Sequence, residues 1–366
     1  MRNLLITGGA GFIGTNFVYY WLQKHPEDRL VVLDALTYAG NPANLAHVNS
    51  SQTYRFVHGD IRDFDLVLNL LQDEKIDTVV HFAAESHVDR SIHGPDIFLD
   101  TNVNGTHTLL KATKSAWLDA PHSSPITPHT KFRFHHVSTD EVYGSLGLND
   151  PAFTETTPYA PNSTYSASKA ASDHLVRAYH KTFGLNVTIS NCSNNYGPYQ
   201  FPEKLIPLAI KNILNGENIP VYGDGLNIRD WLYVEDHCRA IELVLLKGTS
   251  GEVYNIGGNN ELSNIDLVKQ LCDLMDDAFA RSKKLTSRFP KALPAHGKKS
   301  NSLITFVEDR LGHDRRYAID SSKANKELGF TPNESFETGI HKTIDWYLTN
   351  EDWWKLVSEN IHDNIA

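Results

Sequence analysis

A glycine-rich segment near the N-terminus constrains the fold more than any other feature of the sequence. The apolar run Leu4–Thr7 leads directly into Gly8-Gly9-Ala10-Gly11-Phe12-Ile13-Gly14. Glycines at a strand-to-helix turn let the backbone approach a pyrophosphate, which the N–H groups of the helix N-terminus then stabilise. A glycine-rich turn alone is a weak signal, because such turns also occur for steric reasons. Its context favours a dinucleotide site, to which we assign Gly8, Gly11, Phe12, Ile13 and Gly14.

Short apolar runs alternate with helix-length segments through the first half of the chain. These runs are Leu4–Thr7, Leu30–Leu33, Tyr54–Val57, Thr78–Phe82, Phe132–Val137 and Val187–Ser190. The alternation predicts an α/β fold with a Rossmann-type doubly wound parallel sheet. A chain of 366 residues is long for one core, and its pattern becomes irregular after Cys192. We therefore expect a dinucleotide-binding domain carrying the catalytic residues over 1–191. A smaller α/β substrate-binding lobe over 192–366 is expected to interleave with late elements of that domain.

Side chains after the next strands complete the predicted cofactor site. Asp34 ends the second run, twenty residues after Gly14, where a carboxylate accepts hydrogen bonds from a ribose diol and repels a 2′-phosphate. The sequence therefore predicts NAD rather than NADP. The remaining residues assigned to NAD in this part of the chain are Thr37, Asp60, Ile61, Ala83, Ala84, Ser86 and Thr101. For Asp60, capping of the next helix is an open alternative.

Reactive side chains gather around the end of the fifth run. Ser138-Thr139-Asp140-Glu141-Val142-Tyr143-Gly144 is followed, 26 residues after Thr139, by Tyr165 and then Lys169. On a helix, residues four apart share a face, so the ammonium can lower the pKa of the phenol, which can then take a proton from a substrate hydroxyl. Two adjacent carboxylates can supply an acid and a base, although acidic residues after a strand often cap a turn.

With these motifs the chain resembles the extended short-chain dehydrogenase/reductase family. The family fingerprint combines the glycine motif, a Ser/Thr at the end of strand five and Tyr-x-x-x-Lys. The Ser-Thr-Asp-Glu-Val-Tyr-Gly string is similar to that of its nucleotide-sugar 4,6-dehydratases, and the resemblance extends from Met1 to about Trp346. It implies that Thr139 orients a sugar hydroxyl beside Tyr165. It also implies a homodimer formed through the helical segments around 98–117 and 165–179.

Later segments of the chain extend this resemblance to the substrate. They are 191–198, 201–207, 228–236 and 309–317. The resemblance implies that Asn195 lies near the nicotinamide. It further implies that the sugar nucleotide, dTDP-glucose, is bound by Ser86, Thr139, Asn194, Lys204, Leu205, Pro220, Tyr222, Arg229, Asn264, Arg310 and His313. Two features depart from the family: Leu311 replaces the usual proline, and the basic run Arg281–Lys299 is longer than the usual loop. We interpret that run as a solvated loop rather than a polyanion site.

Composition excludes several other classes of protein. A formal net charge of −10 argues against a general nucleic-acid binder. The three cysteines fit neither a disulfide framework nor a zinc site, so we expect a reducing, cytoplasmic location. No apolar stretch is long enough for a membrane span, and we expect no signal peptide. None of the 18 histidines forms a convincing metal pair with a carboxylate, so no metal is predicted.

The predicted activity is NAD-dependent dehydration of the sugar of dTDP-glucose to a 4-keto-6-deoxy sugar. In this hypothesis Tyr165 is the base for oxidation at C4, supported by Thr139 and Lys169. Glu141 then removes the C5 proton, and Asp140 protonates the departing C6 hydroxyl. One alternative is a nucleotide-sugar 4-epimerase, or a decarboxylase acting on a uronic acid, of the same family; neither reaction expels a C6 hydroxyl. The other is a non-catalytic NAD-binding regulator.

Overall fold

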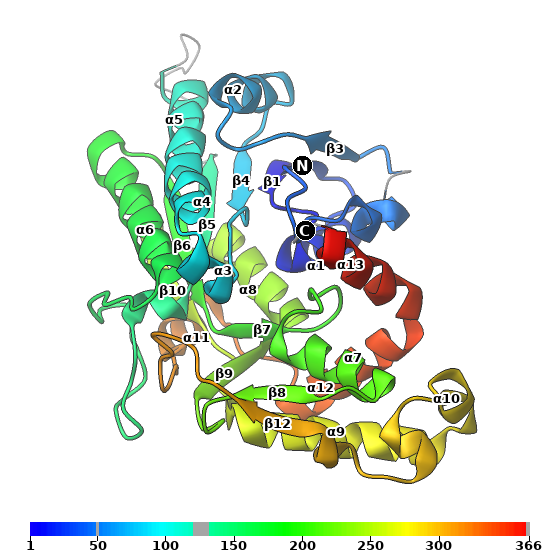
Figure 1. Ribbon diagram of the computed structural model, residues 1–366. Coiled ribbons are helices and arrows are strands. Elements are labelled where there is room, and N and C mark those ends of the chain that lie inside the picture. The colour runs from blue at the N-terminus through cyan, green and yellow to red at the C-terminus, as the bar shows by residue number, and fades with distance from the viewer. Residues whose placement is uncertain (49–50, 120–131, 364–366) are drawn as a thin grey trace.

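The computed structural model describes residues 1–48, 51–119 and 132–363, and its centre is a seven-stranded sheet (Figure 1). The strands are all parallel and follow the order β10-β6-β5-β4-β1-β2-β3. They are β1 (Asn3–Thr7), β2 (Arg29–Asp34), β3 (Tyr54–His58), β4 (Thr78–His81), β5 (Arg133–Thr139), β6 (Val187–Cys192) and β10 (Val253–Ile256). The first six coincide with the predicted runs, which confirms the Rossmann-type fold. Strand order reverses between β1 and β4, where ligands bind in sheets of this kind.

Helices cover both faces of this sheet. One face carries α1 (Phe12–Lys24) and α8 (Val234–Lys247), and the other carries α2 (Phe64–Asp73), α5 (Thr106–Trp117) and α6 (Thr164–Phe183). Within β1, Leu4 and Ile6 pack in the core with Phe17, whereas Leu5 packs in the opposite core with Leu109. Burial on both faces explains why the strands are almost continuously apolar. In the described ranges, no helix combines the length and apolar character needed to cross a bilayer.

A smaller lobe packs beside the carboxyl ends of the sheet strands (Figure 1). It contains β7 (Asn194–Tyr196), β8 (Ile219–Tyr222), β9 (Ile228–Tyr233), β11 (Glu261–Ser263), β12 (Ile304–Val307), α7 (Leu205–Asn215), α9 (Asn264–Arg281) and α12 (Phe336–Thr349). Because β10 and α8 follow β7 in the chain yet belong to the large sheet and its cover, the two parts are interleaved. The functional division near residue 191 stays a prediction.

Short elements connect and extend the two parts. They are η1 (Pro42–Val48), α3 (Val88–His93), α4 (Asp96–Phe98), η2 (Leu99–Gly105), η4 (Asp140–Tyr143), α10 (Lys283–Arg288), η5 (Leu293–His296), η6 (Ser300–Leu303), α11 (Ser322–Leu328) and α13 (Glu351–Asp363). The helix expected around 98–117 is therefore interrupted, because η2 is a π-helical turn. In that wider turn the Asn102 side chain bonds the backbone N–H and C=O of Glu85, at 2.8 and 3.0 Å.

The basic segment 281–299 is not the solvated loop that the sequence predicted. It contains α10 and η5, and the side chains of Phe289 and Ala292 are buried against the core of the smaller lobe. Arg288 pairs with Glu351 of α13 at 2.6 Å. Two apolar anchors and an ion pair distant in sequence order this segment, and local composition reveals neither. Its lysines remain exposed.

Candidate active site

The glycine-rich turn forms a cradle that only glycine permits. Gly8 has a φ of +71°, and a Cβ there would lie 2.6 Å from the backbone nitrogen of Ala83. A Cβ on Gly14 would collide with the carbonyl oxygen of Gly8. Helix α1 begins one residue after Gly11 and has no acidic residue in its first turn. Its N–H groups are therefore available to a pyrophosphate, and the turn fits a dinucleotide.

Replacing Gly14 by alanine is expected to weaken NAD binding by about tenfold or more, because the new methyl group must displace the Gly8 carbonyl from the cradle. Fluorescence titration with NADH measures the loss. Gly94→Ala is the matched control, because a Cβ there would lie 3.8 Å from its nearest neighbour, the Arg90 carbonyl oxygen. Equal affinities for the two variants would contradict the assignment of the cradle.

A cleft of about 340 Å³ extends from this turn along the carboxyl ends of the strands. Every residue predicted to contact the cofactor lines it, including Asn195 from the smaller lobe. Asp34 ends β2, and its two carboxylate oxygens accept the N–H groups of Ala10 and Leu36, both at 2.8 Å. These bonds hold the carboxylate at the cleft, where the ribose diol was predicted to bind.

The proposed capping role of Asp60 is wrong. Helix α2 is capped by Asp63, whose carboxylate accepts the N–H of Leu66. Asp60 instead accepts the backbone N–H of Arg62 at 2.8 Å and forms an ion pair with its guanidinium. It remains on the lining of the cleft.

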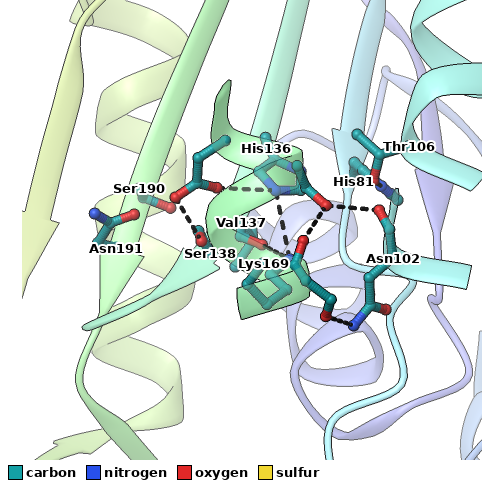
Figure 2. Close-up of polar contacts among 12 residues, drawn as sticks. His81, Asn102, Thr106, His136, Val137, Ser138, Lys169, Ser190 and Asn191 are labelled. Carbon is teal, nitrogen blue, oxygen red and sulfur yellow. Dashed lines mark hydrogen bonds and ion pairs between the residues drawn. The ribbon is translucent and has the colours of Figure 1, made fainter. Parts of the chain in front are cut away.

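Two elements bring Thr139, Tyr165 and Lys169 to the same cleft. Thr139 is the last residue of β5. Helix α6 begins with a capping box at Ser163, which places Tyr165 in its first turn and Lys169 one turn later. Figure 2 shows Lys169 extending from this helix toward β5, where its Nζ donates to the carbonyl oxygen of Val137 at 2.9 Å.

Lys169 was expected from the sequence to lower the pKa of the Tyr165 phenol. In the structure the pKa of Tyr165 is not lowered. Burial raises that pKa well above its ordinary value, Glu141 raises it further, and the Thr139 side chain lowers it. Burial also lowers the pKa of Lys169 to about 8. The ammonium is directed at Val137 and His136, so helical spacing alone did not determine its partner.

The two adjacent carboxylates occupy different environments. Glu141 lines the cofactor cleft and the adjoining cleft of the smaller lobe, whereas Asp140 is 1% exposed and lines neither. Asp140 Oδ1 accepts a long hydrogen bond of 3.4 Å from Thr139. Burial, reinforced by Glu141, raises the pKa of Asp140 well above its ordinary value and so favours the protonated form of this carboxyl group. Asp140 and Glu141 therefore differ in their access to the clefts, although they are neighbours in the sequence.

The adjoining cleft, of about 220 Å³, gathers the residues assigned to the sugar nucleotide. All of them line it except Thr139, which lies on the cofactor side. Burial raises the pKa of Glu141. The positive charges of three side chains oppose that rise, namely Arg229, Lys204 and Arg310. Leu311 is 76% exposed and does not line the cleft, whereas its neighbours Arg310 and Gly312 do.

Several lining residues were missed in the sequence. Asp89 of α3 holds Arg310 through two hydrogen bonds, one of them 2.8 Å long. The backbone oxygen of Asp314 accepts from Arg229 at 3.0 Å. Glu203 lines both clefts. The last two lie inside segments that carried the family resemblance, but nothing local distinguishes them from surface acids.

The fold and site together define an extended short-chain dehydrogenase/reductase with a nucleotide-sugar cleft. The sequence pattern of the GDP-mannose 4,6 dehydratase family matches residues 5–343, and the chain belongs to this family. The dTDP-glucose 4,6-dehydratase of Xanthomonas campestris pv. campestris (strain B100) is 56% identical over 353 residues, which is 96% of this chain and 95% of that protein.

Solved structures of dTDP-glucose 4,6-dehydratases are also similar to this chain. The dTDP-glucose 4,6-dehydratase DesIV from Streptomyces venezuelae, with NAD and TYD bound, matches with a TM-score of 0.84 and 48% identity over 97% of this chain and 100% of that chain. The dTDP-glucose 4,6-dehydratase from Bacillus anthracis str. Ames in complex with NAD matches with a TM-score of 0.82 and 44% identity. The match covers 98% of this chain and 100% of that chain.

Proposed function

We propose that this protein converts dTDP-glucose into dTDP-4-keto-6-deoxyglucose and water, with NAD as a retained cofactor. The observation that carries the proposal is the position of Glu141, which lines both the cofactor cleft and the nucleotide-sugar cleft. A sugar bound between the clefts lies beside Glu141, Thr139 and Tyr165. The names of the relatives and their bound NAD and TYD support the same substrate and cofactor.

The first step assigned to the chain is proton removal from the C4 hydroxyl. Tyr165 acts as the base, Thr139 orients the hydroxyl, and the Lys169 ammonium stabilises negative charge on the phenol oxygen. The turn containing Gly8 and Gly14, together with Asp34, would hold NAD. When bound, NAD supplies the hydride acceptor and returns the hydride to C6. Because the hydride is returned, NAD is not consumed.

The second step requires one base and one acid. Glu141 faces the cleft and can remove the C5 proton, which the C4 ketone has acidified. Burial raises the pKa of Asp140 and favours its protonated form, which suits it to supply the proton that the departing C6 hydroxyl needs. The Thr139 hydroxyl, which donates a hydrogen bond to Asp140 Oδ1, belongs to the neighbouring residue that lines the cofactor cleft.

Incubation with dTDP-glucose tests this function. Mass spectrometry is expected to find a sugar nucleotide lighter by one water, without net formation of NADH. A 4-epimerase would leave the mass unchanged, a uronate decarboxylase would not act on this sugar, and a regulator would bind NAD without turnover. Unchanged mass would overturn the proposal.

Arg310 is expected to contribute to binding of the diphosphate. Arg310→Gln removes a bidentate, charge-assisted partner, so the KM for dTDP-glucose should rise by about 10–100-fold with a smaller change in kcat. Steady-state kinetics measures both constants. Arg315→Gln is the matched control, because Arg315 also pairs with an aspartate, Asp224, but lies outside the cleft lining. A KM that rises equally in both variants would contradict the assignment.

Two further features are proposed for the working enzyme. A homodimer through α5 and α6 is consistent with exposed apolar side chains near these helices, at Ile97, Leu99 and Phe183. Light scattering of the purified protein tests it, and a mass of one chain would contradict it. A cytoplasmic location is consistent with three buried cysteines that are free.

A further inference from the structure

Lys169 lies against a buried polar cluster that the proposed chemistry does not use. Its Nζ is 3.4 Å from His136 Nε2, and the same Nε2 is 3.3 Å from Asp173 Oδ1 (Figure 2 shows His136 and Lys169). Asp173 lies one helical turn beyond Lys169, so Tyr165, Lys169 and Asp173 follow one another along one face of α6. Lys169 is 4%, Asp173 2% and His136 0% exposed.

The Asp173 carboxylate is held by hydrogen bonds at one of its two oxygens. Its Oδ2 accepts the hydroxyl groups of Ser138 at 3.0 Å and Tyr159 at 2.9 Å, and its Oδ1 faces His136. Such donors stabilise the ionised form of a buried carboxyl group, which burial otherwise disfavours. Burial outweighs these hydrogen bonds and raises the pKa of Asp173 to about 6. Asp173 is therefore ionised near neutral pH.

Asp173 is the negatively charged group that stabilises the Lys169 ammonium. Burial lowers the pKa of Lys169, whereas Asp173 opposes that change. The other group acting on Lys169 is the thiol of Cys192, on β6, whose pKa burial raises to about 12, so it is neutral. His81 on β4 and His136 on β5 are neutral as well, because burial lowers their pKa values well below the ordinary range.

The remaining titratable groups around Asp173 are also neutral or favour its charge. Tyr159 and Tyr143 keep their protons near neutral pH, because burial raises the pKa of each phenol. His174, the next residue on α6, favours the ionised carboxylate. A neutral imidazole, that of His136, thus lies between one buried ammonium and one buried carboxylate.

We infer that Asp173 and His136 are positioning residues that keep Lys169 protonated and fixed in place on the lining of the cofactor cleft. The inference rests on the proposed function, in which the Lys169 ammonium supports Tyr165. A buried ammonium without a partner loses its proton, and a neutral amine cannot stabilise a phenolate. Asp173 supplies the opposite charge, and His136 and the Val137 carbonyl fix the Nζ in place.

Removing the charge of Asp173 is expected to move the titration of Lys169. In Asp173→Asn the ammonium loses its stabilising anion, so its midpoint should fall from about 8 by about one to two pH units. NMR of the full-length protein labelled with 15N at lysine side chains measures the midpoint, and Lys169→Met assigns the resonance. This readout needs neither substrate nor turnover.

Two variants separate charge from packing. Tyr159→Phe removes a hydrogen bond to the same carboxylate but keeps its charge, so the Lys169 midpoint should stay within a few tenths of a unit. Asp173→Glu also keeps the charge and should keep the midpoint near that of the wild type. If Asp173→Asn fails to fold, the reciprocal measurement replaces it: in Lys169→Met the pKa of Asp173, about 6 in the wild type, should rise because the ammonium that lowers it is gone, and an unchanged value would overturn the inference.

The same shift should appear in the oxidation step. The alkaline limb of NADH formation from dTDP-glucose, measured in a single turnover, should move to lower pH in Asp173→Asn and stay in place in Tyr159→Phe. A Lys169 midpoint in Asp173→Asn equal to that of wild type would overturn the inference. Absence of dehydration of dTDP-glucose by the wild type at every pH would instead overturn the proposed function, and the NMR result would stand by itself.

Discussion

Replacing Tyr165 by phenylalanine is expected to lower kcat for dehydration of dTDP-glucose by about 10²–10⁴-fold, because the variant has no base for the C4 hydroxyl. The fold should persist, since the buried ring keeps its edge contact with Phe98, at a centroid distance of 6.3 Å. The rate is measured from formation of the keto sugar, and thermal unfolding checks stability.

Tyr179→Phe is the matched control for this substitution. Tyr179 is also a buried tyrosine of α6, but it packs against His107 and Phe183, away from the two clefts. Its replacement should leave kcat near that of wild type. If Tyr165→Phe retained wild-type turnover, proton removal at C4 would have to be assigned to another group.

The double variant Asp140→Asn, Glu141→Gln is expected to stop the reaction after oxidation. The C5 proton then has no base and the C6 hydroxyl no acid, so dehydration should fall by about 10²–10⁴-fold or more. Part of the C4 oxidation should remain, because Tyr165 and Lys169 are unchanged. The trapped hydride is observed as a stable near-ultraviolet absorbance of NADH after addition of dTDP-glucose.

The two single variants separate the roles of the carboxyl groups. Glu141→Gln should block exchange of the C5 hydrogen with solvent deuterium, whereas Asp140→Asn should permit that exchange and slow only loss of the C6 hydroxyl. Amides nearly preserve the shape of both side chains, so a folding defect is not expected. Normal dehydration by the double variant would show that the acid and base have been misassigned.

Much of the large sheet could be predicted from local patterns. Strands buried on both faces are nearly continuous apolar runs, so β1 to β6 stand out in the sequence. The π-helical turn η2 did not, because Leu109 and Trp117 both lie in α5, beyond that turn, and their helical spacing carries no sign of it. The helices within 281–299 were missed since Phe289 and Ala292 find their partners far away in the chain.

The site was predictable wherever function depends on a strand end or a helix face. Gly14, Asp34 and Lys169 all reach the cofactor cleft for that reason. Burial was not predictable: Asp140 and Glu141 are neighbours in sequence, yet one is withdrawn from the clefts and the other lines both. The polar neighbours of Lys169 were also not predicted from the sequence, although Asp173 lies four residues further along the same helix.

The sequence by itself determined the chemical groups of this protein, their order and the strand ends that carry them. These properties follow from short-range backbone preferences and from side-chain periodicity, which act within one element. The tertiary structure alone decided which carboxyl group is withdrawn from the clefts, which cation faces which anion, and where the two clefts meet. Those outcomes depend on desolvation and on charges brought together by packing of β5 against α6, and local spacing contains neither.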